Sequence, residues 1–155
     1  RMDAGLGLLC LGDGAGQWKV LSPSESGLRI LGEQRGAATA DWNQDGRLDL
    51  VVGQNNGQTM LLTNRQAAQG HRIRFKGSSS NEWGIGVQWR LVGDSGRTGP
   101  WQAIHAGSSY GSQNGSLQVA PGLPGMSRLE VLWPGGARSQ HSLEGLQSTQ
   151  RIQQP

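Results

Sequence analysis

Apolar and polar residues alternate along several short stretches of the chain, a pattern typical of β-strands with one buried face. In residues 86–92, for example, Val87, Trp89 and Leu91 point to one side of the expected strand. No segment of the C-terminal half has the 3.6-residue period of an amphipathic helix. Further strands are expected at residues 6–11, 17–21, 71–76, 101–106, 116–119, 128–133 and 138–143.

The composition also indicates an all-β chain of short strands. The 155 residues include 26 glycines and 6 prolines, and apolar types make up 34%. Glycine and proline favour turns over long helices. No run of about eighteen apolar residues occurs, so we expect no membrane span.

An acid-rich stretch, residues 41–49, lies between two expected strands. Three of the six aspartates fall within it, and oxygen-bearing side chains take its first, third, fifth and ninth places. Calcium binds about six to eight oxygens, and glycine at the sixth place allows a sharp turn around the ion. We therefore expect a Ca²⁺ site formed by the side chains of Asp41, Asn43, Asp45 and Asp49 and the backbone carbonyl of Arg47.

Two alternatives exist for this stretch. An EF-hand loop begins in the same way, but it needs a glutamate at its twelfth place and flanking helices; here the twelfth residue is Val52. The other alternative is a turn without metal, since Asp, Asn and Gly favour turns on their own. Three crowded carboxylates repel one another unless a cation is present, which favours the calcium interpretation.

A small-residue strand, a D-x-N-x-D-G-x-x-D loop and an apolar strand, in this order, resemble the FG-GAP repeat, also called the VCBS repeat. The likeness runs through residues 35–53 and 59–64. The resemblance implies a blade of an integrin-like β-propeller with a structural Ca²⁺ ion. A propeller typically needs about four to eight blades, so we expect the C-terminal part of a larger propeller-like protein.

The C-terminal half resembles the ASPIC and UnbV domain, which follows FG-GAP repeats in proteins of the cartilage acidic protein type. The likeness is carried by residues 73–77, 80–87, 107–113 and 129–136. The resemblance implies an FG-GAP/VCBS-type region at residues 1–66 and an ASPIC/UnbV-like β-domain at residues 67–155. The expected fold is all-β, with a partial β-propeller blade followed by a small β-sandwich or barrel-like domain.

The charge pattern bears on a nucleic-acid partner, and the single cysteine bears on thiol chemistry. The net charge of +3 comes from 14 basic residues scattered among 11 acidic ones. Arg72, Arg74 and Lys76 alternate with apolar residues, which indicates a solvated strand face; no nucleic-acid motif accompanies them, so we expect no nucleic-acid partner. Cys10 is the only cysteine, and its leucine neighbours favour a buried, inert thiol.

Catalytic interpretations are weak. Residues 107–111 match G-x-S-x-G, the string of a hydrolase nucleophile elbow. Ser109 would be the nucleophile, and His141 and Asp94 would complete a catalytic triad. A nucleophile elbow needs a strand that turns into a helix, whereas turn-forming residues follow here. We therefore expect no enzymatic activity.

The chain has six tryptophans. Trp89 and Trp133 take inward positions of expected strands and are assigned to the core. Trp83 and Trp101 lie near loops and remain candidates for stacking on sugars, because tryptophan combines a large apolar face with a polar N–H.

These patterns favour a non-enzymatic, calcium-binding interaction or cell-adhesion module that is secreted, periplasmic or at the cell surface. Calcium sites of extracellular modules have dissociation constants on the order of 10⁻⁴–10⁻³ M. The expected partners are other protein chains or the upstream part of the same polypeptide, with glycans as a further possibility. The alternatives are a structural subunit of a cell-surface assembly and a carbohydrate-binding accessory domain.

Overall fold

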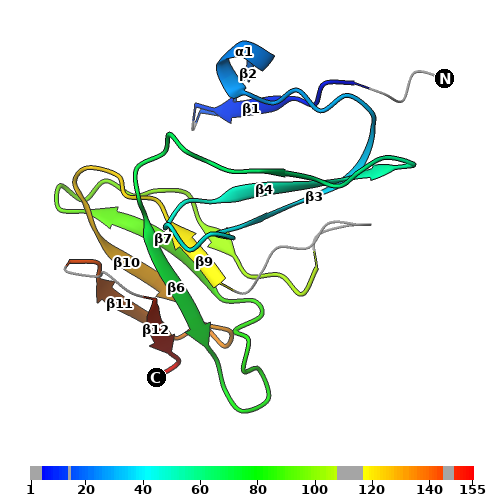
Figure 1. The fold of residues 1–155 in the computed structure, drawn as a ribbon. Coiled ribbons are helices and arrows are strands. Elements are labelled where there is room, and N and C mark those ends of the chain that lie inside the picture. The colour runs from blue at the N-terminus through cyan, green and yellow to red at the C-terminus, as the bar shows by residue number, and fades with distance from the viewer. Residues whose placement is uncertain (1–4, 14, 108–116, 145–148) are drawn as a thin grey trace.

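The computed structural model describes residues 5–13, 15–107, 117–144 and 149–155 and shows an all-β protein (Figure 1). Strands make up 46% of it and helix 3%. The described strands form four small sheets, none of which closes on itself. Within these residues, helical structure long or apolar enough for a bilayer span is absent.

The N-terminal part contains a hairpin and a three-stranded sheet. The hairpin pairs β1 (Leu9–Gly12) with β2 (Trp18–Leu21). A single helical turn, α1 (Pro23–Ser26), follows. The sheet has the antiparallel order β3 (Glu33–Ala40), β4 (Asp49–Asn55) and β5 (Met60–Leu62). In Figure 1 the β3–β4 hairpin lies between the β1–β2 hairpin and the sheets of the C-terminal part.

The helical turn α1 is capped by its own sequence. The Ser22 hydroxyl accepts the backbone N–H of Glu25, and the Glu25 carboxylate accepts the backbone N–H of Ser22 at 2.8 Å. This reciprocal capping satisfies two donors that a helix start leaves unpaired.

The C-terminal part contains two sheets. One has the order β12–β6–β9 and the other the order β11–β10–β7–β8. All their pairings are antiparallel except that of β12 with β6, which is parallel. The strands are β6 (His71–Lys76), β7 (Gln88–Gly93), β8 (Gln102–Ala103), β9 (Leu117–Ala120), β10 (Met126–Leu132), β11 (Arg138–Ser142) and β12 (Gln150–Gln153).

One apolar cluster joins these two sheets. Phe75 from β6 lies 6.4 Å from the ring centre of Trp89 on β7, and 6.1 Å from that of Trp133 in an edge-to-face arrangement. Such aromatic pairs add to the stabilisation that burial alone provides. The cluster comprises Ile73, Phe75, Val87, Trp89, Leu91, Ile104, Ala120, Leu129, Val131, Trp133, Leu143 and Ile152.

The alternation along β7 and β10 is confirmed. Val87, Trp89 and Leu91 are buried, as are Leu129 and the other inward residues of β10. The burial of Trp89 and Trp133 also agrees with the prediction that they belong to the core. The strand β12 was not predicted, and the G-x-S-x-G string, including Ser109, lies outside the described residues except at Gly107.

Two expectations from the sequence are wrong. Cys10 is exposed and not buried, because β1 pairs only with β2 and the face that carries Cys10 is uncovered in the described residues. Arg72 is not simply a solvated residue of β6, because its guanidinium forms an ion pair with a buried carboxylate of the acid-rich loop. Arg74 and Lys76 are exposed, as expected.

Candidate metal centre

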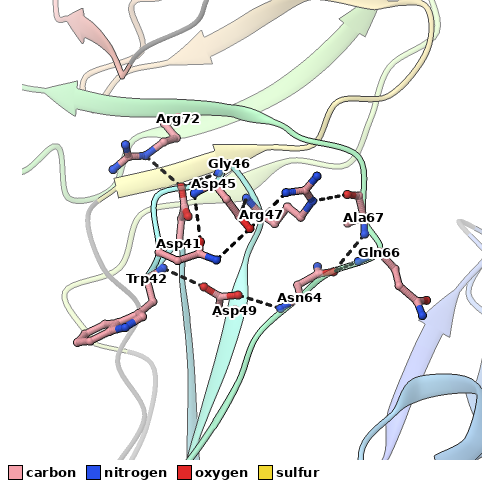
Figure 2. Close-up of polar contacts among 11 residues, drawn as sticks. Asp41, Trp42, Asp45, Gly46, Arg47, Asp49, Asn64, Gln66, Ala67 and Arg72 are labelled. Carbon is pink, nitrogen blue, oxygen red and sulfur yellow. Dashed lines mark hydrogen bonds and ion pairs between the residues drawn. The ribbon is translucent and has the colours of Figure 1, made fainter.

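The acid-rich loop connects β3 to β4. Ala40 at the end of β3 pairs with Asp49 at the start of β4, so residues 41–48 close back on themselves. Two positions of the loop have positive φ angles, Gln44 at 63° and Gly46 at 79°. Glycine adopts such angles without the steric cost that a Cβ atom brings, and Gly46 therefore allows the reversal. The loop lies against the start of β6 (Figure 2).

Three of the expected ligand side chains hold the loop's own backbone. One oxygen of Asp41 accepts the N–H of Gly46 at 3.0 Å. Asn43 accepts the N–H of Asp45 at 3.1 Å, and Asp45 accepts the N–H of Arg47 at 2.9 Å. Asx turns of this kind are the reason why Asp and Asn favour loops. These bonds bring Asp41, Asn43 and Asp45 onto one compact turn.

Asp49 acts as a brace. Its side chain accepts the backbone N–H of Trp42 at 3.0 Å through one oxygen and that of Asn64 at 2.9 Å through the other. The residue is only 2% exposed. Asp49 therefore ties the first residues of the loop to the segment that follows β5.

Two arginines balance the remaining loop charges. Arg47 places its terminal nitrogen 3.2 Å from Asp45 and also donates from Nε to the carbonyl of Ala67 at 2.6 Å. Arg72 from β6 places Nε 3.1 Å from the Asp41 carboxylate. Figure 2 shows Arg72 beside Asp41, and Arg47 between Asp45 and Ala67. Of the predicted ligands, Arg47 thus contributes its side chain to charge balance.

The pKa of the Asp45 carboxyl lies below its ordinary value. Burial acts in the opposite direction and would raise the pKa, but hydrogen bonds from the Asn43 side chain and from Arg47, together with the Arg47 charge, outweigh it. Asp45 is therefore ionised at neutral pH and attracts cations.

The Asp41 side chain has a buried oxygen atom that accepts no hydrogen bond. Asp41 is 8% exposed, and its Oδ1 atom is buried without a hydrogen bond. A buried carboxylate oxygen without a donor is costly unless a cation or donor reaches it. This orphaned oxygen, on the same turn as Asn43 and Asp45, fits the oxygen chemistry that calcium prefers.

The acidic side chains nevertheless do not form a ready-made cluster. Among the described residues, no three His, Cys, Asp or Glu side chains are placed to hold one metal ion together. The reason is visible in the loop, where Asp49 is directed to Trp42 and Asn64 and Asp45 is directed to Arg47. A full set of five ligands requires these side chains to shift.

The two described candidates for a catalytic triad, Asp94 and His141, each have another hydrogen-bond partner. Asp94 and His141 line the same polar depression of about 410 Å³, but Asp94 is bonded by the Ser127 hydroxyl and His141 lies 2.9 Å from the Ser139 hydroxyl. Burial lowers the pKa of His141.

The two tryptophans considered for sugar stacking differ in their surroundings. Trp83 is 61% exposed. Trp101 is 37% exposed, and the Arg90 guanidinium lies 4.6 Å from the centre of its ring.

The sequence interpretation missed two contributors to the loop. The alternating pattern assigns Arg72 to solvent, and the polar segment at residues 64–70 is interpreted only as the boundary between the two domains. In the structure Gly70 donates its N–H to the carbonyl of Gly46 at 2.8 Å. The only sequence signal for Arg72 was its place in a row of alternating basic residues.

No protein-family model matches the chain, and no curated protein gives a significant match. The fold and the loop define the class of the molecule, an all-β protein in which an acid-rich turn between antiparallel strands contacts a second group of sheets.

Proposed function

We propose that residues 41–49 bind Ca²⁺ and that the chain is a non-enzymatic interaction or adhesion module outside the cytosol. The observation that carries the calcium site is Asp41 Oδ1, a buried carboxylate oxygen without a hydrogen bond, in a turn that also carries the side chains of Asn43 and Asp45. A divalent cation satisfies this oxygen and offsets the local excess of negative charge.

The proposed ligands are the side chains of Asp41, Asn43, Asp45 and Asp49 and the backbone carbonyl of Arg47. Asp41 and Asn43 already use one oxygen each to hold the turn, which preorganises them. Asp45 joins them by leaving Arg47, and Asp49 by using lone pairs that its two backbone N–H partners do not occupy. The bound ion supplies positive charge that cross-links the turn, so its binding energy stabilises the fold.

The proposal is tested by thermal unfolding of the chain in EGTA and in about 10 mM CaCl₂. With a dissociation constant on the order of 10⁻⁴–10⁻³ M, calcium adds about 1.4–2.7 kcal/mol of stability. For a chain of this size that corresponds to a rise in Tm of about 3–10 °C. An identical melting curve in both solutions would count against the site.

A matched pair of variants locates the effect. Asp45→Asn removes a charge but keeps an acceptor for the Arg47 N–H, and we expect it to abolish most of the calcium-induced rise in Tm. Asp13→Asn is the control, because Asp13 forms a similar turn by accepting the N–H groups of Ala15 at 2.7 Å and Gln17 at 3.0 Å. The control should keep the full rise.

The interaction role rests on the β1–β2 hairpin. Leu8, Cys10, Trp18 and Val20 are all exposed, and the last three lie on one face of the hairpin by the register of its pairs. Adjacent exposed apolar side chains of this kind mark interaction surfaces. We propose that this face packs against a further FG-GAP-type blade, contributed by the upstream part of the polypeptide or by another protein chain.

The same proposal covers architecture and location. β1–β5 correspond to a partial propeller blade of FG-GAP/VCBS type, and β6–β12 to a sandwich-like domain of ASPIC/UnbV type. The apolar core between the two sheets of β6–β12 supports the sandwich interpretation, because both sheets contribute residues to it. Secretion, or placement in the periplasm or at the cell surface, follows from a weak calcium site that needs millimolar calcium.

Glycan binding is a second candidate, favoured by the exposure of Trp83. A flat exposed indole ring stacks on the apolar face of a sugar, as it does on other apolar groups. Titration with oligosaccharides should then quench tryptophan fluorescence in the unchanged chain and less in Trp83→Ala. Equal quenching in both would remove Trp83 as the platform.

A further inference from the structure

The Asp41 carboxylate contacts one group from its own loop and one group from the C-terminal part. Its Oδ2 atom accepts the Gly46 N–H from within the loop and also lies 3.1 Å from Nε of Arg72, which belongs to β6. The Asp41 side chain has no exposure to solvent, and that of Arg72 is 22% exposed. Water therefore screens this ion pair much less than it screens a pair on the open surface.

The contact is an ion pair and not a well-aligned hydrogen bond, because Arg72 Nε is buried without a hydrogen-bond partner. One terminal nitrogen of the same guanidinium reaches Gln44 of the loop at 3.4 Å. Arg72 is thus held beside the loop by charge at Asp41 and by a long bond at Gln44. A cation that is held at a carboxylate mainly by charge competes with any other cation that approaches the same carboxylate.

We propose that Arg72 is a built-in competitor for the calcium site. This inference rests on the proposed function, because it concerns the affinity of the same loop. The guanidinium lies on one oxygen of Asp41, while the oxygen that is free for calcium, Oδ1, belongs to the same carboxylate. Two cations that share one buried carboxylate repel each other, so Arg72 lowers the affinity of the loop for Ca²⁺.

The competition is reciprocal. A residue that weakens calcium binding through its own ion pair has that pair weakened by calcium to the same extent. Since Arg72 belongs to β6 and Asp41 to the β3–β4 loop, calcium loosens one of the contacts between the loop and the β12–β6–β9 sheet. Arg72 thereby gains a regulatory role that the ligands themselves do not have.

Arg47 does not play the same part. It pairs with Asp45, whose side chain is 30% exposed, and its Nε is held by the Ala67 carbonyl. Solvent screens that pair more strongly. Arg74 supplies a closer comparison with Arg72, because it lies two residues further along the same face of β6, is exposed and carries the same charge.

The test is calcium titration calorimetry on the full chain and on the variants Arg72→Gln and Arg74→Gln. Coupling between two sites typically amounts to about 5–150-fold in affinity, and we expect Arg72→Gln to bind Ca²⁺ at least about tenfold more tightly than the unchanged chain. Arg74→Gln removes the same charge at an exposed, screened position and should stay within about threefold.

The titrations distinguish failure of the proposed competition from failure of the calcium site. Equal tightening in both variants, or no tightening in Arg72→Gln while the unchanged chain binds calcium, overturns the competition and leaves the calcium site standing. Absence of binding in the unchanged chain and in both variants overturns the calcium site, and the inference with it.

A second variant covers the case in which Arg72→Gln does not fold. Arg72→Met removes the charge but keeps an unbranched apolar side chain in place of the arginine stem. Removal of the charge should again tighten calcium binding by about fivefold or more, the lower end of typical coupling. Unchanged or weaker binding in Arg72→Met, while the unchanged chain binds calcium, would overturn the competition.

Discussion

Asp49 accepts the backbone N–H of Asn64 at 2.9 Å, although the two residues are fifteen positions apart in the sequence. The same carboxylate accepts the N–H of Trp42 with its other oxygen. A residue that the spacing assigns to metal binding is therefore also a structural brace between the start of the loop and the end of the β3–β4–β5 sheet.

The first prediction concerns this brace. Asp49→Ala leaves the N–H groups of Trp42 and Asn64 without their acceptor, and hydrogen bonds to charged groups contribute about 1.5–3 kcal/mol each. We expect a loss of roughly 3–6 kcal/mol in the free energy of unfolding, measured by urea denaturation in EGTA so that calcium does not contribute.

Asp49→Asn is the matched control, because the amide oxygen still accepts one of the two N–H groups. It should lose less stability than Asp49→Ala. A change of less than about 0.5 kcal/mol in Asp49→Ala, the range of ordinary surface substitutions, would contradict the bracing role.

The second prediction concerns Gly46. Its φ angle is 79°, and a Cβ atom there would lie 2.7 Å from the Gln69 side chain and 2.9 Å from the backbone oxygen of Gly70. Gly46→Ala should therefore be destabilised by the left-handed backbone, at about 1–2 kcal/mol, and further by the clash with Gly70.

Gly96→Ala separates these two causes. Gly96 has a similar φ angle of 81°, but a Cβ atom added there would meet no atom within 4 Å. It should lose only the backbone contribution of about 1–2 kcal/mol. Thermal melts of both variants make the comparison, and equal losses would show that the loop does not pack closely against Gly70.

The third prediction concerns Glu130 and pH. A hydrogen bond from Arg90 holds the pKa of the Glu130 carboxyl below its ordinary value; burial opposes this shift, and Arg138 supports it. The contact distances are 2.7 Å to Arg90 and 2.8 Å to Arg138. Because the folded pKa is depressed, the stabilisation is present above the ordinary carboxyl pKa and is lost as the pH falls through the folded value.

Urea denaturation between about pH 7 and pH 3 measures this loss. Glu130→Gln should lower the free energy of unfolding at pH 7 by about 1–3 kcal/mol, because two guanidinium groups lose their charged acceptor. It should also reduce the fall in stability at acid pH. Glu82→Gln, at an exposed position, is the control; an equal flattening there would refute the assignment to Glu130.

The fourth prediction concerns Cys10. Its thiol is exposed on β1, opposite Val20 of β2. Thiols that solvent reaches react without prior unfolding, so the native chain should take up one maleimide group at neutral pH. Mass spectrometry measures the uptake with and without denaturant. Labelling that needs denaturant would mean that a partner or a second copy covers this face.

Strands with one buried face were predictable from the sequence. In β7 and in the second half of β10, buried and less buried residues alternate because every second residue enters the core formed with Phe75 and its neighbours. The strand β12 gave no such signal, because Ile152 is its one apolar residue. Its conformation depends on parallel pairing with β6, which no local pattern encodes.

The acid-rich loop was predictable as a turn, but its electrostatics were not. The spacing of Asp41, Asn43 and Asp45 indicates oxygen ligands, and the structure places all three on one turn. The pairing of Asp41 with Arg72 depends on how the loop meets β6, which lies far along the chain. The alternating pattern alone predicts that Arg72 faces solvent. It carries no information about a loop that packs on the outer face of the strand.

The ion pair between Asp41 and Arg72 has a mechanical consequence. Arg72 lies on β6, the middle strand of its sheet, with β9 on one side and β12 on the other. A pulling force on the β3–β4–β5 sheet is therefore transmitted partly through this charged contact into a central strand of the C-terminal part. The covalent segment between β5 and β6 does not bear that tension alone.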